Sequence, residues 1–319
     1  MKVLVTGASG FVGQSVVKAL KLADVYVVAV GRHLSASEAE ETVSIPDYCA
    51  EDVWQAPLSG CDIVIHLAAR VHVMHDVAEN PLAAFLAVNL NGTVNLAYAA
   101  AKANVKRFVY VSSIKVNGEF TEKQPFSEDD ASNPQDPYAV SKWQAEQALR
   151  LIEQETGMEV VILRPPLIYG AGVKANFASL LKLVDKALPL PLASINNKRS
   201  LIYLGNFVDA VVTCAKHPNA AGQTFLVSDG EGVSMAELVE KIAFSLNKPS
   251  YVFPFPVAIM RFFAKLVNKT TSLDRLSQSL VVDSTKIYKT LSWQPPFTME
   301  EGLKITADGY RQLSKSEQI

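Results

Sequence analysis

Tyr138 and Lys142 stand four residues apart, and Pro137 comes directly before this pair. On a helix that Pro137 helps to start, this spacing places both side chains on one face. A free phenol titrates near pH ~10, and an adjacent ammonium lowers that pKa because it stabilises the phenolate. The pair is therefore a candidate for acid/base chemistry, although Tyr-x-x-x-Lys is common on helices and is usually structural.

A third candidate group is the hydroxyl of Ser113, which with Ser112 follows an apolar run at residues 108–111. We expect this run to form a strand whose carboxyl end carries the two serines. Open α/β sheets bind their ligands at that edge, so a serine hydroxyl there can hydrogen-bond a reacting oxygen.

Strands and helices that alternate from the N-terminus must position these groups. Short apolar runs suit strands buried on both faces and occur at residues 3–5, 25–30, 63–67, 108–111 and 160–163. Helical patterns long enough for parallel crossovers lie between them, at residues 11–22, 83–103 and 138–155. The order predicts an α/β fold with a Rossmann-type, doubly wound parallel sheet. After residue 163 the pattern becomes Pro-rich and mixed, which indicates a smaller C-terminal region folded against the sheet.

Three glycines follow the first predicted strand at intervals of three and open the first helix. Glycine there permits a tight turn and close approach of the backbone to a pyrophosphate, while the helix N-terminus supplies N–H donors. A strand before the glycines and a helix after them is the context that the dinucleotide fingerprint requires. We expect the cofactor to contact Gly7, Gly10, Phe11, Val12 and Gly13.

The second predicted strand ends in Gly31 and Arg32, where an NAD-binding chain usually has Asp or Glu for the adenosine ribose. The missing carboxylate and the arginine favour NADP over NAD, because a guanidinium can pair with the 2'-phosphate. The alternative is that Arg32 is a solvated surface charge. Loops after later strands add further expected cofactor contacts at Asp52, Val53, Leu67, Ala68 and Ala69.

The composition excludes several classes of protein. The 319 residues are 49% hydrophobic and 19% charged, with a formal net charge of −2, which is typical of a globular protein and does not favour nucleic-acid binding. No leader pattern precedes the first strand, so we expect a cytoplasmic protein. Three cysteines without CxxC spacing predict no metal site. Residues 253–267 are too short and too interrupted to span a bilayer, so we expect a packed helix and no membrane insertion.

At this point the sequence resembles the extended short-chain dehydrogenase/reductases of the NAD-dependent epimerase/dehydratase family. The motifs that carry the resemblance run through nearly the whole chain and are TGASGFVG, HLAA, VNLNGTVNL, FVYVSS, PYAVSK, RPPLIYG and DSTKIYKTLSW. The resemblance implies an NAD(P)-binding domain at residues 1–165, with a returning segment near 200–230, and a mainly nucleotide-sugar-binding region at 166–319.

The same resemblance assigns roles to the candidate groups. Tyr138 is then the acid/base, Lys142 lowers its pKa and holds the nicotinamide ribose, and Ser113 positions the substrate oxygen. Asn89 would lie near the proton path of Lys142, although an Asn in that helix could equally be a local hydrogen-bonding break.

The two residues after Ser113 argue against the dehydratase reaction of the family. Its sugar dehydratases have Asp-Glu there to eliminate water, whereas this chain has Ile114 and Lys115. The stretch looks instead like bacterial UDP-sugar 4-epimerases or 4-keto-sugar reductases of surface-polysaccharide (O-antigen) pathways. Lys115 would then point at the sugar or the diphosphate.

Three more residues resemble the nucleotide-sugar contacts of the family, namely Asn176, Arg199 and Arg275. Guanidinium groups fit phosphate oxygens, but either arginine could be a solvated surface charge. The family also implies a homodimer formed by the helices at 83–103 and 138–155.

The expected substrate is therefore a nucleotide sugar, with UDP as the favoured carrier, and the expected reaction is hydride transfer at C4. Because Gly31 offers no ribose anchor for a permanently held NAD, we favour a 4-keto-sugar reductase that uses NADPH. The alternatives are a UDP-hexose or N-acetylhexosamine 4-epimerase, a non-catalytic NAD(P)-sensing regulator, and an enzyme for an unrelated ketone or aldehyde.

Overall fold

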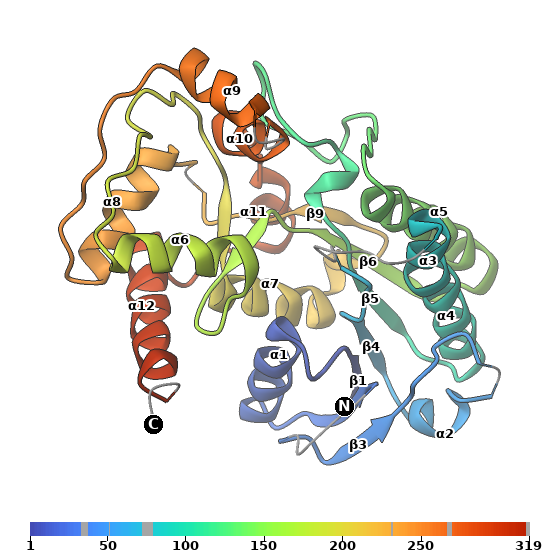
Figure 1. The fold of residues 1–319 in the computed structure, drawn as a ribbon. Coiled ribbons are helices and arrows are strands. Elements are labelled where there is room, and N and C mark those ends of the chain that lie inside the picture. Colours follow the sequence, from blue (N-terminus) through green and yellow to red (C-terminus); the bar gives the residue numbers. More distant parts are fainter. Residues whose placement is uncertain (33–37, 51, 72–78, 231, 267–269, 317–319) are drawn as a thin grey trace.

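The computed structural model describes all residues except 33–37, 51, 72–78, 231, 267–269 and 317–319. One parallel sheet of seven strands forms its centre (Figure 1). In spatial order the strands are β3 (Glu41–Ser44), β2 (Tyr26–Gly31), β1 (Lys2–Thr6), β4 (Ile63–His66), β5 (Arg107–Val111), β6 (Glu159–Arg164) and β9 (Thr224–Leu226). The order reverses between β1 and β4, so the predicted doubly wound, Rossmann-type sheet is confirmed.

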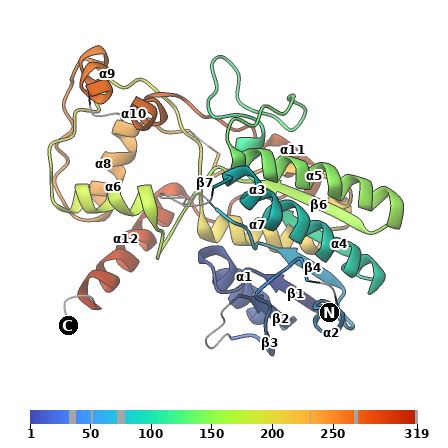
Figure 2. The same cartoon turned by 45° about the vertical axis from the view of Figure 1, so that its right-hand side comes forward.

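Alternating side chains divide the core of the sheet between two layers of helices. In β1, Val3 and Val5 pack into one apolar cluster, and Leu4 packs into the other. Figure 2 shows the helices of the two layers on opposite sides of the sheet. One layer holds α1 (Phe11–Leu22) and α7 (Leu204–Lys216); the other holds α2 (Gln55–Leu58), α3 (Pro81–Leu86), α4 (Gly92–Lys102) and α5 (Pro137–Thr156).

Helix α5 begins and ends where its sequence directs. The carboxylate of Asp136 accepts a hydrogen bond from the backbone N–H of Ala139 at 2.7 Å, and Pro137 occupies the first turn, where its missing N–H costs nothing. Gly157 closes the helix in the left-handed conformation, with φ of 73°.

The helix expected at residues 83–103 is divided in the structure. A π-helical turn, η1 (Ala87–Asn91), separates α3 from α4, and the buried Asn89 lies within it. Such turns recur at functional sites. Among the described residues, Pro81–Lys102 is also the one helical stretch long and apolar enough to cross a membrane, a test that core helices pass as well.

Most of the remaining elements form the second part of the molecule, beside the sheet in Figure 1. They are β7 (Leu167–Tyr169), α6 (Ala175–Asp185), β8 (Leu201–Tyr203), α8 (Met235–Ser245), α9 (Val257–Leu266), α10 (Thr270–Ser277) and α12 (Met299–Ser316). Three short elements lie with the sheet instead: η2 (Ile114–Val116) contacts α5, η3 (Pro218–Ala220) contacts α7, and α11 (Thr285–Leu291) contacts β9. Strands β7 and β8 pair in parallel as a separate small sheet. One continuous apolar cluster joins this part to the α1 and α7 layer.

Candidate active site

The glycine loop after β1 leaves no room for side chains. A Cβ on Gly13 would lie 2.1 Å from the carbonyl oxygen of Gly7, and a Cβ on Gly7 would lie 2.8 Å from the backbone N of Ala68. Gly7 also has φ of +66°, which favours glycine. Gly10 precedes α1, and no side chain caps this helix or places a carboxylate in its first turn. These residues fit a dinucleotide diphosphate, which needs close backbone approach and free N–H donors.

Tyr48 borders the same loop and was missed by the sequence reasoning. Its buried side chain lies near the backbone of Gly7, and its ring packs edge-on against Trp54 with centroids 5.0 Å apart. Burial raises the pKa of Tyr48, while the nearby charge of Arg32 opposes that rise. Arg32 is exposed at this edge of the loop, and residues 33–37 lie outside the described part of the chain.

The structure brings the three predicted catalytic groups together at the carboxyl end of the sheet. Ser113 follows β5, and its side chain lies near enough to the half-buried phenol of Tyr138, in the first turn of α5, to affect the pKa of that phenol. Lys142 lies one turn later and is 2% exposed. The arrangement provides a phenol, a hydroxyl and an ammonium on neighbouring elements, although their catalytic roles remain predictions.

Burial is the main influence on the pKa values of both Tyr138 and Lys142. It raises the pKa of Tyr138 to about 12; the nearby Ser113 hydroxyl opposes this rise, and the charge of Asp136 adds to it. The Lys142 Nζ lies over the ring of Tyr110, 4.3 Å from its centroid. Burial lowers the pKa of Lys142 to about 7, against the opposing charge of Glu146. The Tyr110 ring and the Glu146 carboxylate therefore stabilise the Lys142 ammonium only in part, and the loss of solvation on burial has the larger effect on its pKa.

Asn89 connects α5 to the π-helical turn. Its Nδ2 donates to the Ser141 Oγ at 2.9 Å and to the backbone oxygen of Arg70 at 3.0 Å, while its Oδ1 accepts from the Arg70 N–H at 2.7 Å. Ser141 in turn donates to the backbone oxygen of Tyr138 at 2.7 Å. Asn89 thus fixes the first turns of α5, in addition to interrupting its own helix.

A buried relay of hydrogen bonds leads from this point to the phosphate loop. The Thr93 hydroxyl donates to the backbone oxygen of Asn89 at 2.8 Å, so it must accept from the His66 Nε2, 2.9 Å away. The Thr6 hydroxyl then donates to the His66 Nδ1 at 2.6 Å and accepts from the Ala68 N–H at 3.2 Å. Burial and the charge of Lys142 lower the pKa of His66 to about 3, which keeps this imidazole neutral. The HLAA motif predicted cofactor contacts but not this link.

A buried ion pair supports the opposite side of Lys142. The Arg164 guanidinium donates to both carboxylate oxygens of Glu146, at 3.0 and 2.6 Å, and to the Asn117 Oδ1 at 2.9 Å. Only 7% of the Arg164 side chain and 2% of the Glu146 side chain are exposed. Because Glu146 lies on α5, one turn beyond Lys142, the pair anchors this helix to the end of β6.

Lys115, expected at the sugar or the diphosphate, lies in ion pairs instead. Its Nζ is 2.5 Å from an Asp136 carboxylate oxygen and 2.8 Å from one of Glu119. Both acids line a cavity of about 740 Å³ at the start of α5, together with Asp274 and Gln278. Two carboxylates neutralise the ammonium, so this arrangement favours a structural role, and a substrate contact would require one pair to open.

The other predicted substrate residues are not gathered as closely. Asn176 is exposed in the first turn of α6. Arg199 donates from Nη1 to the backbone oxygen of Gln278 at 3.1 Å, which places it beside the cavity. Arg275 belongs to α10, but its side chain lies outside the described residues.

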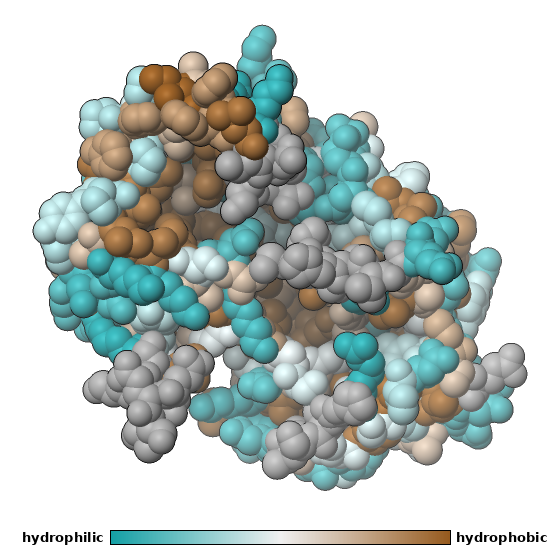
Figure 3. Space-filling view, viewed as in Figure 1, coloured by the Kyte–Doolittle hydropathy of each residue, from teal (hydrophilic) through white to brown (hydrophobic). Residues whose placement is uncertain are grey.

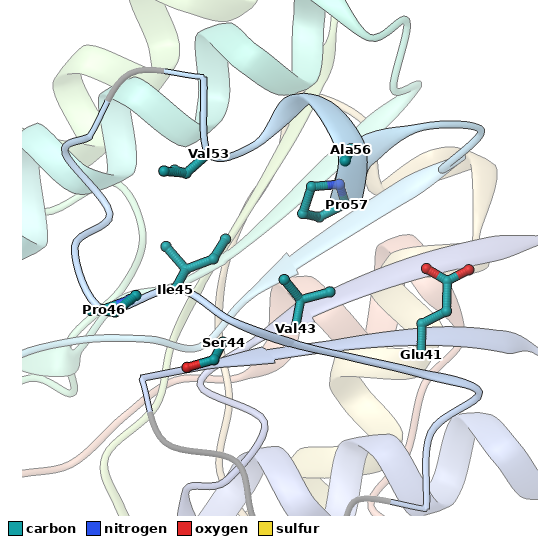
Figure 4. A pocket seen from close by; sticks show the side chains of 8 residues that line it. All are labelled: Glu41, Val43, Ser44, Ile45, Pro46, Val53, Ala56 and Pro57. Atoms are coloured by element: carbon teal, nitrogen blue, oxygen red, sulfur yellow. The ribbon is translucent and has the colours of Figure 1, made fainter.

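Two expected cofactor residues lie near the outer edge of the sheet. Asp52 is exposed, with φ of 61°, and Val53 faces a hollow of about 400 Å³ between β3 and α2 (Figure 4). The apolar side chains of Val43, Ile45 and Pro57 line the same hollow. Of the described lining residues, Val53 alone is an expected cofactor contact, so this hollow is not the catalytic cleft.

The sheet, the glycine loop and the Ser-Tyr-Lys group define a nicotinamide-dependent enzyme of the extended short-chain dehydrogenase/reductase type. The NAD dependent epimerase/dehydratase family matches residues 3–228, and the chain belongs to this family.

Individual relatives cover nearly the whole chain. A UDP-glucose 4-epimerase of Vibrio cholerae is 46% identical over 315 residues, 98% of this chain and 96% of that protein. An N-acetyl-alpha-D-glucosaminyl-diphospho-ditrans,octacis-undecaprenol 4-epimerase of Escherichia coli O157:H7 is 29% identical over 321 residues, 95% and 93% of the two chains. The crystal structure of a UDP-glucose 4-epimerase from Thermotoga maritima with UDP-glucose has a TM-score of 0.78 at 23% identity, covers 98% of this chain and 100% of that chain, and supports the fold.

Proposed function

We propose that this protein is an NAD-dependent 4-epimerase of a UDP-linked hexose or N-acetylhexosamine. The observation that carries the proposal is the full-length similarity, at 46% identity, to the Vibrio cholerae UDP-glucose 4-epimerase. The more distant Escherichia coli relative is also named a 4-epimerase, and its named substrate carries the sugar on a diphosphate. Inversion at C4 of a diphosphate-linked sugar is common to both.

The residues of this chain supply the binding and proton-transfer steps. Gly7, Gly10 and the first turn of α1 would hold the diphosphate of the cofactor. The nicotinamide of a bound cofactor would supply the hydride chemistry, accepting a hydride from the sugar carbon and returning it. Tyr138 would take the proton of the C4 hydroxyl and give it back, with Ser113 orienting the same oxygen. Return of the hydride to the other face of the sugar inverts C4.

The comparisons favour the epimerase over the NADPH-dependent reductase that the end of β2 had suggested. The missing carboxylate at Gly31 and the presence of Arg32 were weak guides, because the ribose can also be bound by backbone groups and residues 33–37 are not described. NAD is therefore the proposed cofactor, and Arg32 is proposed to lie at the edge of its site.

An epimerase regenerates its NAD in every turnover, so we predict that NAD stays bound during purification and need not be added to the assay. Protein purified without added cofactor should release NAD in near-stoichiometric amount on denaturation, and should interconvert UDP-glucose and UDP-galactose, or their N-acetyl forms, when none is added. Chromatography of the supernatant and of the sugar nucleotides measures both. If the protein instead oxidises NADPH only when a 4-keto sugar nucleotide is present, and does not epimerise UDP-sugars, the protein is a reductase and the epimerase proposal is wrong.

We also propose that the protein forms a homodimer through the outer faces of α4 and α5. Tyr98 on α4 is 45% exposed and Leu151 on α5 is 59% exposed, so each outer face offers apolar area to a symmetric partner. Light scattering at micromolar concentration should give twice the mass of the chain, and Leu151→Lys should shift it toward the monomer. A monomeric wild-type protein would contradict this assembly.

A further inference from the structure

Helix α9 exposes an apolar face on the side where a surface helix is normally polar. Val257 and Met260 face inward and pack against the main apolar cluster. At 3.6 residues per turn, Phe262 and Leu266 lie on the opposite side of the helix, and these two side chains are 62% and 66% exposed. The expected packed helix at 253–267 therefore packs on one side only, and its outward side resembles a core-facing one.

This face is larger than a single exposed side chain. Ile259 and Phe263 border Phe262 and Leu266 and are 43% and 57% exposed. Figure 3 shows hydrophobic residues gathered over α9, at the top of the molecule. Scattered apolar residues are normal on a protein surface, but a contiguous patch marks an interaction site. We call these four residues the α9 patch.

The charges around the α9 patch select the kind of partner. Arg261 and Lys265 are exposed, four residues apart, and flank the patch on one side. Asp274 of α10 pairs with Arg261 at 3.2 Å, and residues 251–266 themselves contain no Asp or Glu, so the net charge of Arg261, Lys265 and Asp274 is positive. An isologous contact with a second copy would bring these cations near their own symmetry mates. An anionic lipid surface would instead attract them while the apolar side chains enter the acyl boundary.

We propose that α9 docks on an anionic phospholipid membrane, parallel to its surface, with the α9 patch inserted at the level of the headgroups. The contact is peripheral and does not require a spanning helix. Helix α10 packs against α9, and its Asp274 lines the 740 Å³ cavity beside the catalytic helix. Docking would therefore hold the rim of this cavity near the membrane surface.

Sedimentation with vesicles tests the proposal on the full-length protein. We expect binding to vesicles of phosphatidylcholine and phosphatidylglycerol, and weaker binding to phosphatidylcholine alone. The double variant Phe262→Ser/Leu266→Ser should lower the partition coefficient at least about tenfold, since it removes two apolar side chains that would enter the bilayer. Lys265→Gln should lower it about fivefold on the anionic vesicles only, and added salt should reduce that difference.

A matched control removes the same residue types elsewhere. Phe244 on α8 and Leu22 on α1 are more exposed, at 83% and 79%, so Phe244→Ser/Leu22→Ser should bind vesicles as the wild type does. Both double variants should retain soluble epimerase activity, which shows that they fold. The proposal is overturned if the wild type binds neither vesicle, if both pairs lose binding equally, or if Phe262→Ser/Leu266→Ser changes the mass in solution, which would identify a second copy as the occupant.

Discussion

Tyr138→Phe should reduce turnover by at least about 10²- to 10⁴-fold, the range that a positioned acid/base group contributes. The variant keeps the ring and removes the one atom that can exchange a proton with the sugar hydroxyl. The nearby Ser113 side chain keeps the hydrogen bond that it accepts from the Lys115 backbone N–H at 3.3 Å, so the variant leaves this hydroxyl in place. Steady-state interconversion of the two UDP-sugars measures the loss.

The cofactor content separates a catalytic role of Tyr138 from a structural one. NAD released on denaturation should remain near stoichiometric in Tyr138→Phe, because the glycine loop and α1 are untouched. Tyr110→Phe is the matched control: it also removes a phenol hydroxyl in the same region, but it keeps the ring face that contacts the Lys142 ammonium. Near-normal turnover in Tyr138→Phe, or an equal loss in both variants, would remove Tyr138 from the acid/base role.

The fold was predictable because its signals are local and repeated. Apolar runs buried on both faces mark the strands. The glycines at positions 7 and 13 mark places where neighbouring backbone atoms leave no room for a Cβ. The Tyr138 to Lys142 spacing likewise predicts a shared helix face. These features depend on residues near each other in the sequence, so pattern reasoning reaches them.

The supporting contacts of the site were not predictable, because they join residues far apart in the chain. Thr6, His66 and Thr93 form one relay from three elements, and each alone is an ordinary buried polar residue. The environment of Tyr138 was hidden for a related reason: the sequence shows that Lys142 is near, but it does not show that the phenol is buried and that burial raises its pKa. Lys115 was expected at the substrate from the family resemblance alone, and its ion pair with Asp136, 21 residues away, is visible only in the fold.

The exposed face of α9 shows the opposite difficulty. Pattern reasoning takes apolar residues to be buried, so Phe262 and Phe263 predicted packing. Composition reports how apolar a helix is, but only the structure shows which side of it meets the core.

Arg164→Met should destabilise the protein by about 3–5 kcal/mol, the cost of removing one partner from a buried ion pair. The substitution leaves the Glu146 carboxylate, 2% exposed, without the two charged hydrogen bonds that it now accepts. Asn117 also loses its guanidinium partner. Lys142, one turn away on α5, can offset only part of this charge because its ammonium lies over the Tyr110 ring. Urea unfolding, followed by circular dichroism, measures the change in the free energy of unfolding.

Two further variants decide whether the buried charge is the cause. In Arg164→Met/Glu146→Gln no carboxylate is left uncompensated, so stability should return toward the wild type by more than half of the loss. Arg311→Met breaks an exposed pair with Asp308, whose side chains are 36% and 53% accessible, and a hydrogen bond to the Ser245 backbone oxygen at 2.8 Å, and should cost about 1–2 kcal/mol. If Arg164→Met costs no more than Arg311→Met, or if the double variant is less stable than the single one, the pair does not anchor α5. A loss restored by Glu146→Gln would instead show that a buried charge one turn beyond Lys142 is tolerated only because Arg164 neutralises it.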